Sequence, residues 1–373
     1  MKILIGADMV PTERNKELFV AGDAHALVGD DLYNILSDAD VRIFNLEVPL
    51  ADKTTPIEKR GPSLIAPIDT IYGYKALKTD ILTLANNHIL DQGMLGLQST
   101  IDTLQAHKIA YLGAGSTPEQ ASRPYVFSCD GKKIGLYACA EHEYSIVTET
   151  SPGANPIDLL ESLDHIYELK RQCDFVIVLY HGGKEYYRYP SPQLQKICRK
   201  MIEKGADLVL CQHTHCVGCE EKYQEGTIVY GQGNFLFDNH SDEYWNTGLL
   251  VEVGDDFNIS YYPIQKNNGI IKLAIGKEAK QILDGFKERS IEIQSEGFVT
   301  KRYQEFAASM LNQYLLRVGG KQNLVFRTLN KLTKNGLIKN KYGRSQILSM
   351  QNSLECEAHR ELFVCGLKEV LRK

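Results

Sequence analysis

The sequence contains no run of about 18 apolar residues, which is the length that a helix needs to cross a membrane. The apolar run at its start covers only residues 1–7 and ends at the acidic Asp8 rather than at a small-residue cleavage site, unlike a signal peptide. We interpret this run as the first strand of the fold and expect a cytoplasmic protein. A leader that had been removed would leave no mark in the sequence.

Other absences narrow the class of protein further. The nine cysteines are an odd number and are scattered, several of them inside apolar runs, so we expect no disulfide framework. No Gly-x-Ser-x-Gly motif of a serine hydrolase occurs, and the Gly-rich turn at residues 113–117 lacks the spacing of a dinucleotide site. Cys216 and Cys219 form a Cys-x-x-Cys pair. Because no second pair accompanies it, a structural role is favoured over zinc binding or redox chemistry.

Acidic residues are missing from one part of the chain. Between Glu305 and Glu355 there are eight Lys and Arg and no Asp or Glu, although the whole chain has a net charge of −5. This asymmetry indicates a polyanion, an acidic protein partner or a membrane surface, and it is also typical of a solvated helical face that balances an acidic body. We do not expect nucleic acid as a partner.

What the sequence does contain is an alternation of short apolar runs with helix-length segments over its first 240 residues. The runs are rich in Val, Ile, Leu and Tyr and are too short for helices. The alternation predicts βαβ units with parallel strands, and therefore an α/β fold. The predicted strands are residues 3–6, 41–46, 81–84, 109–112, 134–140, 175–179, 208–211, 227–230, 247–253 and 258–263.

After about residue 270 the pattern changes to amphipathic helices, which are predicted at 277–289, 300–317, 321–332 and 345–371. We therefore divide the chain into an α/β catalytic domain, residues 1–265, and a basic helical C-terminal region, residues 266–373. The C-terminal helices are the candidate site for a protein partner or an oligomer contact.

Polar side chains with metal-ligand chemistry follow five of the predicted strands. Because the carboxyl ends of parallel strands meet at one edge of a sheet, we expect these side chains to lie together. Carboxylates, imidazoles and an amide suit one or two divalent transition metals, namely Mn, Zn or Fe. A bridging Glu47 would hold two metals about 4 Å apart. The candidate metal ligands are Asp8, Glu47, Asn87, His181, His213 and His215.

The motifs around these residues resemble those of the CapA (poly-γ-glutamate capsule biosynthesis) family, which is itself similar to calcineurin-like metallophosphoesterases. The resemblance runs in order over residues 1–240. It rests on Asn45-Leu46-Glu47, Asn86-Asn87-His88-x-x-Asp91-x-Gly93, His181-Gly182-Gly183-x-Glu185-Tyr186, Gly205-Ala206-Asp207, His213-x-His215 and Tyr230-Gly231-x-Gly233-Asn234-Phe235.

The resemblance implies a four-layer αββα metallophosphatase-like sandwich, followed here by a helical C-terminal extension. It implies that His88 is the general acid or base beside the metals, and that Asp91 orients it. In the metal centre it implies Asp8 and His215 at the first metal, Asn87, His181 and His213 at the second, and Glu47 as the bridge.

Two positions depart from the phosphoesterase pattern. Val10 stands where a His is usual, and Glu47 stands where an Asp is usual. These departures weaken the case for the first metal and for cleavage of a phosphate ester.

Other polar residues are candidate contacts to a substrate. Lys59 and Arg60 form a basic pair suited to a carboxylate or phosphate, although a surface pair is the more common explanation. Residues 141–143, Glu-His-Glu, follow a predicted strand to the same edge, either as a further ligand or contact or as an exposed loop. The candidate substrate-binding residues are Asn45, Lys59, Arg60, Lys184, Glu185, Tyr186 and Asn234.

These features predict a metal-dependent hydrolase of a phosphoester or amide bond in an anionic polymer, a peptide or a phosphorylated small substrate. The resemblance places this activity in capsule or cell-surface polymer metabolism. Two alternatives remain open: a metal-dependent peptide epimerase at the same centre, and a non-catalytic accessory subunit of a polymer synthase that docks through the basic helices.

Overall fold

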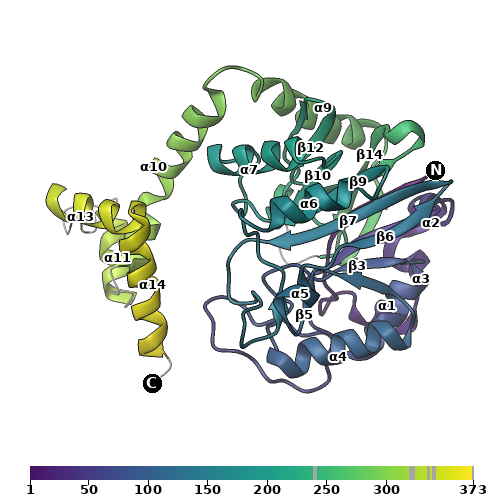
Figure 1. Cartoon of the computed structure of the whole chain (residues 1–373), viewed down its shortest axis with the longest axis horizontal. Helices are drawn as coiled ribbons and strands as arrows, with labels where there is room; N and C mark the ends of the chain where they lie inside the picture. Colours follow the sequence, from purple (N-terminus) through teal and green to yellow (C-terminus); the bar gives the residue numbers. More distant parts are fainter. Residues whose placement is uncertain (238–241, 319–323, 334–336, 338–341, 372–373) are drawn as a thin grey trace. The chain divides into compact units, whose positions relative to one another are not determined.

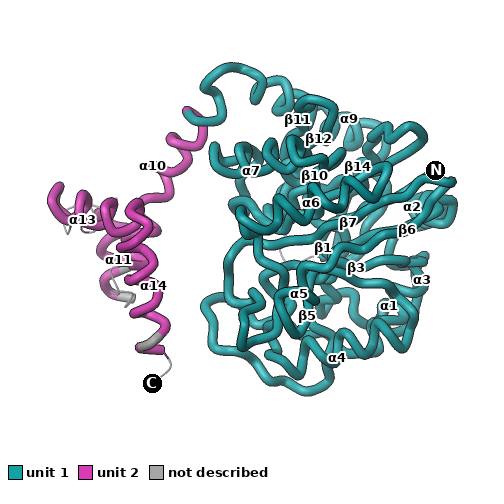
Figure 2. Tube along the Cα trace, viewed as in Figure 1, with its two compact units in different colours: residues 1–300 teal, residues 301–373 magenta. Residues whose placement is uncertain are grey.

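The computed structural model describes residues 1–237, 242–318, 324–333, 337 and 342–371 (Figure 1). The internal contacts divide the chain into two compact units, Met1–Thr300 and Lys301–Lys373 (Figure 2). The first unit contains two stacked β-sheets with helices on their outer faces, and the second contains helices.

The first sheet has seven strands, and its middle is parallel. Strand β1 pairs in parallel with β2, β2 with β3, and β3 with β4, whereas β13, β14 and β15 continue the sheet antiparallel from the other side of β1. In spatial order the strands are β15 (Ile270–Leu273), β14 (Ile259–Asn267), β13 (Thr247–Val253), β1 (Ile3–Met9), β2 (Val41–Leu46), β3 (Ile81–Thr83) and β4 (Ala110–Leu112).

The second sheet has six strands, of which the central four are parallel. Strands β6 and β11 are antiparallel and close its two edges. In spatial order the strands are β11 (Glu220–Tyr223), β12 (Gly226–Tyr230), β10 (Leu208–Gln212), β9 (Phe175–His181), β7 (Lys132–Ala140) and β6 (Tyr125–Cys129). A separate two-stranded pair joins β5 (Ala114–Gly115) to β8 (Gly153–Ala154).

The alternation of side chains along the strands explains the layers. On β9, Ile177 points into the core between the two sheets, where it joins residues such as Ile5 and Ile43 of the first sheet. Its neighbour Val178 points to the opposite face and packs in the cluster that contains Ile166 of the outer helix α6 (Ser162–Lys170). Because both faces of β9 are buried, its sequence is continuously apolar rather than alternating.

Helices cover the two outer faces, so the structure confirms the predicted four-layer αββα sandwich. Figure 1 shows α6 and α7 on one side of the stacked sheets and α4 on the other. The first sheet carries α1 (Lys16–Ala21), α2 (Ala24–Ser37), α3 (Ile71–Ala76) and α4 (Gly93–Ala106), and the second carries α6 and α7 (Pro192–Glu203). Shorter elements are α5 (Pro118–Ala121), α8 (Glu243–Asn246) and the 3-10 turns Ile68–Thr70 and Asp255–Phe257.

The division between the two units falls after Thr300, whereas the sequence placed a boundary after residue 265. Strand β15 lies beyond that expected boundary and extends the first sheet. Helix α9 (Gly276–Glu292) also packs on the first unit, because its Phe286 is buried in the core between the sheets. Helical periodicity alone did not distinguish a helix that covers a sheet from one of the C-terminal extension.

The second unit is built from helices, as the amphipathic pattern predicted for the end of the chain. They are α10 (Phe298–Val318, which begins in the first unit), α11 (Leu324–Leu332), α13 (Arg344–Glu355) and α14 (Glu357–Leu371). The single helix predicted over 345–371 is two helices, because Cys356 has extended backbone angles, φ −71° and ψ 119°. The start of the helix predicted over 321–332 lies outside the described residues.

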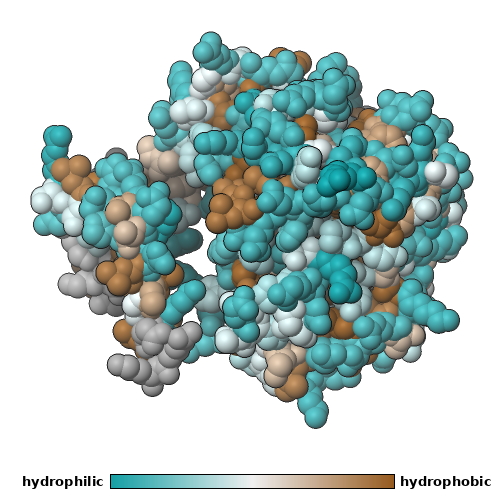
Figure 3. All heavy atoms as spheres, viewed as in Figure 1, coloured by the Kyte–Doolittle hydropathy of each residue, from teal (hydrophilic) through white to brown (hydrophobic). Residues whose placement is uncertain are grey.

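Within the described part of the chain, no helix combines the length and the apolar character needed to traverse a bilayer. The cytoplasmic location stays a prediction. On the face seen in Figure 3, hydrophilic residues dominate and apolar ones form small separate groups.

The middle of β1 requires a glycine. A Cβ built on Gly6 would lie 2.3 Å from Cδ1 of Phe44, whose ring packs against Phe235 with centroids 4.8 Å apart. We expect Gly6→Ala to lower the free energy of unfolding by about 1–3 kcal/mol, because the added methyl overpacks a closed core.

Urea denaturation of the full chain measures this effect. The control is Gly254→Ala, because a Cβ at Gly254 would lie 3.7 Å from its nearest neighbour. Equal midpoints for the two variants would contradict the packing assigned to Gly6.

Candidate metal centre

The predicted ligands converge where the carboxyl ends of the parallel strands of both sheets meet. From the first sheet, Asp8 lies near the end of β1, Glu47 follows β2, and Asn87 follows β3. From the second sheet, His181 ends β9, and His213 and His215 follow β10. All six side chains are at least 91% buried, since none exceeds 9% exposure.

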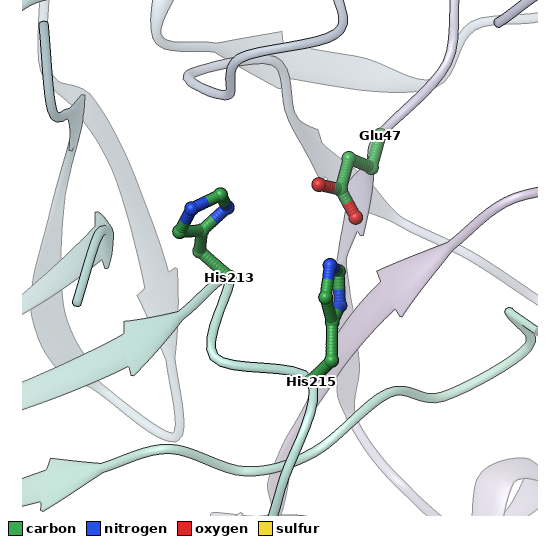
Figure 4. Close-up of side chains that lie close together, drawn as sticks. All are labelled: Glu47, His213 and His215. Atoms are coloured by element: carbon green, nitrogen blue, oxygen red, sulfur yellow. The ribbon is translucent and has the colours of Figure 1, made fainter. Parts of the chain in front are cut away.

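Glu47 is the centre of this arrangement. It is fully buried, and neither of its carboxylate oxygens makes a hydrogen bond of good geometry with the described residues. Figure 4 shows its carboxylate facing the rings of His213 and His215. Ligand atoms of these three residues lie within 4.8 Å of one another, and so do those of Asp8, Glu47 and His181. Glu47 belongs to both groups, so it is the residue that these two candidate metal-binding groups share.

The nitrogen Nε2 of His181 is surrounded by other ligand atoms. It lies 3.0 Å from Oδ1 of Asn87, 3.1 Å from Nδ1 of His213 and 3.2 Å from Oε1 of Glu47. One imidazole nitrogen cannot form good hydrogen bonds with all three, since it carries one proton or one lone pair. A cation shared by these four atoms accounts for their convergence, and the donor set of nitrogen and oxygen atoms fits Mn, Zn or Fe.

Asp8 and His215 are also close to each other. Oδ2 of Asp8 is 3.6 Å from Nδ1 of His215. That Nδ1 lies 2.8 Å from Oδ1 of Asn234 and donates to it, which leaves Nε2 of His215 as the nitrogen that can bind a metal. Asn234, predicted as a substrate contact, is only 1% exposed and accepts a hydrogen bond from His215.

Asn45 contacts several of these groups. Its Nδ2 donates to Oδ1 of Asp8 at 2.7 Å and lies 3.3 Å from Nδ1 of His181. Its Oδ1 accepts hydrogen bonds from Thr83 and from Asn86. Asn45 was predicted as a substrate contact, but it is fully buried and contacts two of the candidate ligands, Asp8 and His181.

The His213-x-His215 segment has strained backbone. Both histidines have positive φ angles, 86° for His213 and 54° for His215, a conformation that costs non-glycine residues energy and that clusters at functional sites. The ring of Trp245 stacks on His215 with centroids 4.6 Å apart and an interplanar angle of 21°. The strained turn is therefore supported by packing rather than left exposed.

Burial disfavours the charged forms of the groups in this cluster. Burial raises the pKa of Glu47 to about 8 and, together with the charge of Glu47, raises that of Asp8 to about 6. Burial lowers the pKa of His181 to about 4 and lowers those of His213 and His215 as well. The imidazoles are therefore neutral near pH 7, and Glu47 is largely protonated there unless positive charge lies beside it.

His88 stands beside the cluster in a pair with Asp91. Nδ1 of His88 lies 2.6 Å from Oδ2 of Asp91, which is fully buried. The second oxygen of Asp91 forms an ion pair with Lys59, whose side chain is only 4% exposed. Lys59 was predicted to contact a substrate, which requires an exposed side chain. In the structure it is buried and contacts Asp91 instead. Its neighbour Arg60 is exposed.

The remaining predicted contacts line the rim. Nζ of Lys184 lies 3.5 Å from Oε2 of Glu185, and Oε1 of Glu185 lies 4.0 Å from Nε2 of His215. Tyr186 is 39% exposed, with its ring centroid 6.1 Å from that of His215. From the loop after β7, Glu143 accepts a hydrogen bond from Nδ2 of Asn87 at 3.3 Å, so this loop does reach the site.

Sequence reasoning missed two residues of the site. Trp245 gave no signal, because an aromatic in a short helix is ordinary. Lys266 was assigned to the basic C-terminal region, yet it is 2% exposed and its Nζ donates to the carbonyl of Asn234 at 2.8 Å. The alternation along β14, where Lys266 shares a face with the buried Ile264, was the available signal.

Cys216 and Cys219 are buried free thiols, in agreement with the structural role favoured by their sequence. Burial raises the pKa of Cys216 to about 11, which keeps its thiol protonated and unreactive near neutral pH.

Comparison with known proteins agrees with the resemblance. The family model described as bacterial capsule synthesis protein PGA_cap matches residues 5–239. The chain is 30% identical over 181 residues to the capsule biosynthesis protein CapA of Bacillus anthracis, covering 47% of this chain and 44% of that protein. It is 26% identical over 212 residues to a probable polyglutamine synthesis accessory protein of Mycobacterium tuberculosis, covering 53% and 56%. The match thus spans about half the length of these relatives.

Among solved structures, a putative 5′-nucleotidase from Staphylococcus aureus is 15% identical with a TM-score of 0.43, covering 76% of this chain and 57% of that one. This likeness is too distant to bear on function. Because the family model matches well over half of the sequence, the chain belongs to the bacterial capsule synthesis protein PGA_cap family.

Proposed function

We propose that this protein is a metal-dependent hydrolase whose centre holds two divalent transition metals, with Glu47 between them. The observation that carries the proposal is the fully buried Glu47 carboxylate, which has no hydrogen-bond donor among the described residues and is ringed by Asp8 and three histidines. The ionised form of such a carboxylate is stable only beside positive charge.

In this proposal, the ligands divide about Glu47. Asn87, His181 and His213 would hold one metal, and Asp8 and His215 would hold the other. Cations at such a centre supply Lewis-acid activation of water and of the scissile group. Burial keeps the imidazoles unprotonated, so they are available as ligands near neutral pH.

His88 is the proposed proton-transfer residue. Asp91 occupies its Nδ1, so Nε2 is the nitrogen that takes a proton from the attacking water or gives one to the leaving group. Tyr186 and Glu185 at the rim are proposed to contact the part of the substrate next to the cleaved bond. The exposed Arg60 is proposed to contact an anionic group farther from that bond.

The names of the relatives support a substrate from polymer metabolism. Two relatives are described as proteins of capsule or PGA biosynthesis. We therefore propose a phosphoester or amide bond of an anionic polymer or peptide as the target. The name of the M. tuberculosis relative favours a second candidate, an accessory subunit of a polymer synthase.

The metal centre makes a prediction about Asn234. Removing its side chain frees Nδ1 of His215, so we expect Asn234→Ala to weaken binding of one metal by about 10–100-fold, the usual cost of losing a group that orients a ligand. Titration of the chelator-treated protein with Zn²⁺ or Mn²⁺, followed by calorimetry, measures the affinity.

The matched control is Asn155→Ala. Asn155 is also buried and its Nδ2 donates to the carbonyl of Ala138 at 2.7 Å, away from the ligands. Equal metal affinity in the two variants would contradict the role given to Asn234.

Replacement of His88 separates the two candidate functions. We expect His88→Asn to lower kcat on bis-p-nitrophenyl phosphate, or on a poly-γ-glutamate chain, by about 10²–10⁴-fold because proton transfer is lost. Metal content, measured by inductively coupled plasma mass spectrometry, is expected to stay unchanged. His165→Asn is the control, because His165 contacts Tyr137 rather than the centre.

Normal polymer production by a strain that carries His88→Asn would overturn the hydrolase in favour of the accessory subunit. Bound metal without cleavage of either substrate by the unaltered protein would favour the epimerase instead.

A further inference from the structure

The loop at residues 55–64 is tied to the segment that carries Asp91. Thr55 donates from its N–H to Oε1 of Gln92 and from its hydroxyl to the Gln92 carbonyl, both at 2.7 Å. Farther along the loop, the N–H of Ile57 donates to the Asp91 carbonyl at 3.0 Å, as does the hydroxyl of Ser63 at 3.1 Å. Both ends of the loop are therefore hydrogen-bonded to residues 91–92.

Lys59 lies in the middle of this loop and reaches inward. Its Nζ pairs with Oδ1 of Asp91 and lies 3.3 Å from Nδ1 of His88. The other oxygen, Oδ2, lies 2.6 Å from Nδ1 of His88 and also accepts the N–H of Leu64 at 2.6 Å. Both carboxylate oxygens are therefore engaged from fixed directions.

This pattern assigns the proton on His88. A carboxylate only accepts, so the nitrogen that faces Oδ2 of Asp91 must carry a proton. Nε2 of His88 is then the nitrogen with the free lone pair. The Lys59 ammonium lies closer to Oδ1 of Asp91 than to Nδ1 of His88, so its main partner is the carboxylate and not the imidazole.

We propose that Lys59 is a positioning residue. Its ammonium holds the Asp91 carboxylate in the orientation that fixes the tautomer and the ring angle of His88. Nε2 is thereby kept unprotonated and oriented for proton transfer. The catalytic consequence rests on the proposed function, whereas the effect on the tautomer does not. The role differs from a grip on substrate, because the side chain is 4% exposed and its charge is already paired.

The matched variants are Lys59→Met and Arg60→Met. Both remove one cation from the same loop, but Arg60 is exposed and Lys59 is not. Lys59→Arg tests rescue, because a guanidinium also donates to a carboxylate. Asp91→Asn and the double variant Lys59→Met/Asp91→Asn complete a cycle.

The first readout needs no activity. In the zinc-loaded full chain labelled with ¹⁵N-histidine, we expect a downfield Nδ1 proton of His88, identified by its loss in His88→Asn. Lys59→Met and Asp91→Asn are expected to remove it or to introduce the other tautomer. Arg60→Met is expected to leave it unchanged and Lys59→Arg to keep it.

The second readout is kinetic. We expect Lys59→Met to lower kcat on bis-p-nitrophenyl phosphate by about 10–100-fold with KM and metal content unchanged, the scale seen when a supporting group is lost. In the double variant, no loss beyond that of Asp91→Asn is expected, because both act through one carboxylate.

Two results would overturn the proposal. An unchanged His88 resonance in Lys59→Met would reduce Lys59 to a tether of the loop. A raised KM at constant kcat would make it a substrate contact. If the unaltered protein has no turnover, the hydrolase fails, and the resonance alone decides the role of Lys59.

Discussion

The structure depends on one buried charge. Glu47 lies where two stacked sheets end, out of contact with water and without a hydrogen-bond donor among the described residues. An isolated ionised carboxylate in such a place would cost more than the whole stability of a typical fold, so Glu47 is ionised near neutral pH only where positive charge is supplied. The other features of the site follow from this requirement: neutral imidazoles around it, an amide at its edge, and a strained His213-x-His215 turn that presents both rings to the same point.

The stacking of the sheets makes the site possible. Each sheet contributes ligands only from the carboxyl ends of its parallel strands, and neither sheet has a complete set. Asn45 connects the two halves, because its amide contacts Asp8 on its own sheet and His181 on the other. The core between the sheets, which includes Ile5, Ile43 and Ile177, therefore sets the distance across the metal centre.

Much of this site could be predicted from sequence, because its ligands follow apolar runs that end at one edge. Asp8, His181 and His213 are of that kind. The resemblance to the CapA family added the order of the motifs, and the match to the family model confirmed the family over residues 5–239. The position of Lys59 could not be predicted in this way. Lys59 and Asp91 are 32 residues apart in the sequence, and the fold of the intervening loop brings them into contact. Lys266 was missed because it was counted only as one of the positive charges of a basic region. Counting charges does not reveal which lysine is buried.

An anomalous-scattering map of crystals soaked in Mn²⁺ or Zn²⁺ tests the central claim most directly. We expect two peaks about 3.5–4 Å apart, both within coordination distance of the Glu47 carboxylate. One peak should lie against Asn87, His181 and His213, and the other against Asp8 and His215. No peak at Glu47, or peaks only at the rim near Glu185, would contradict the bridged centre.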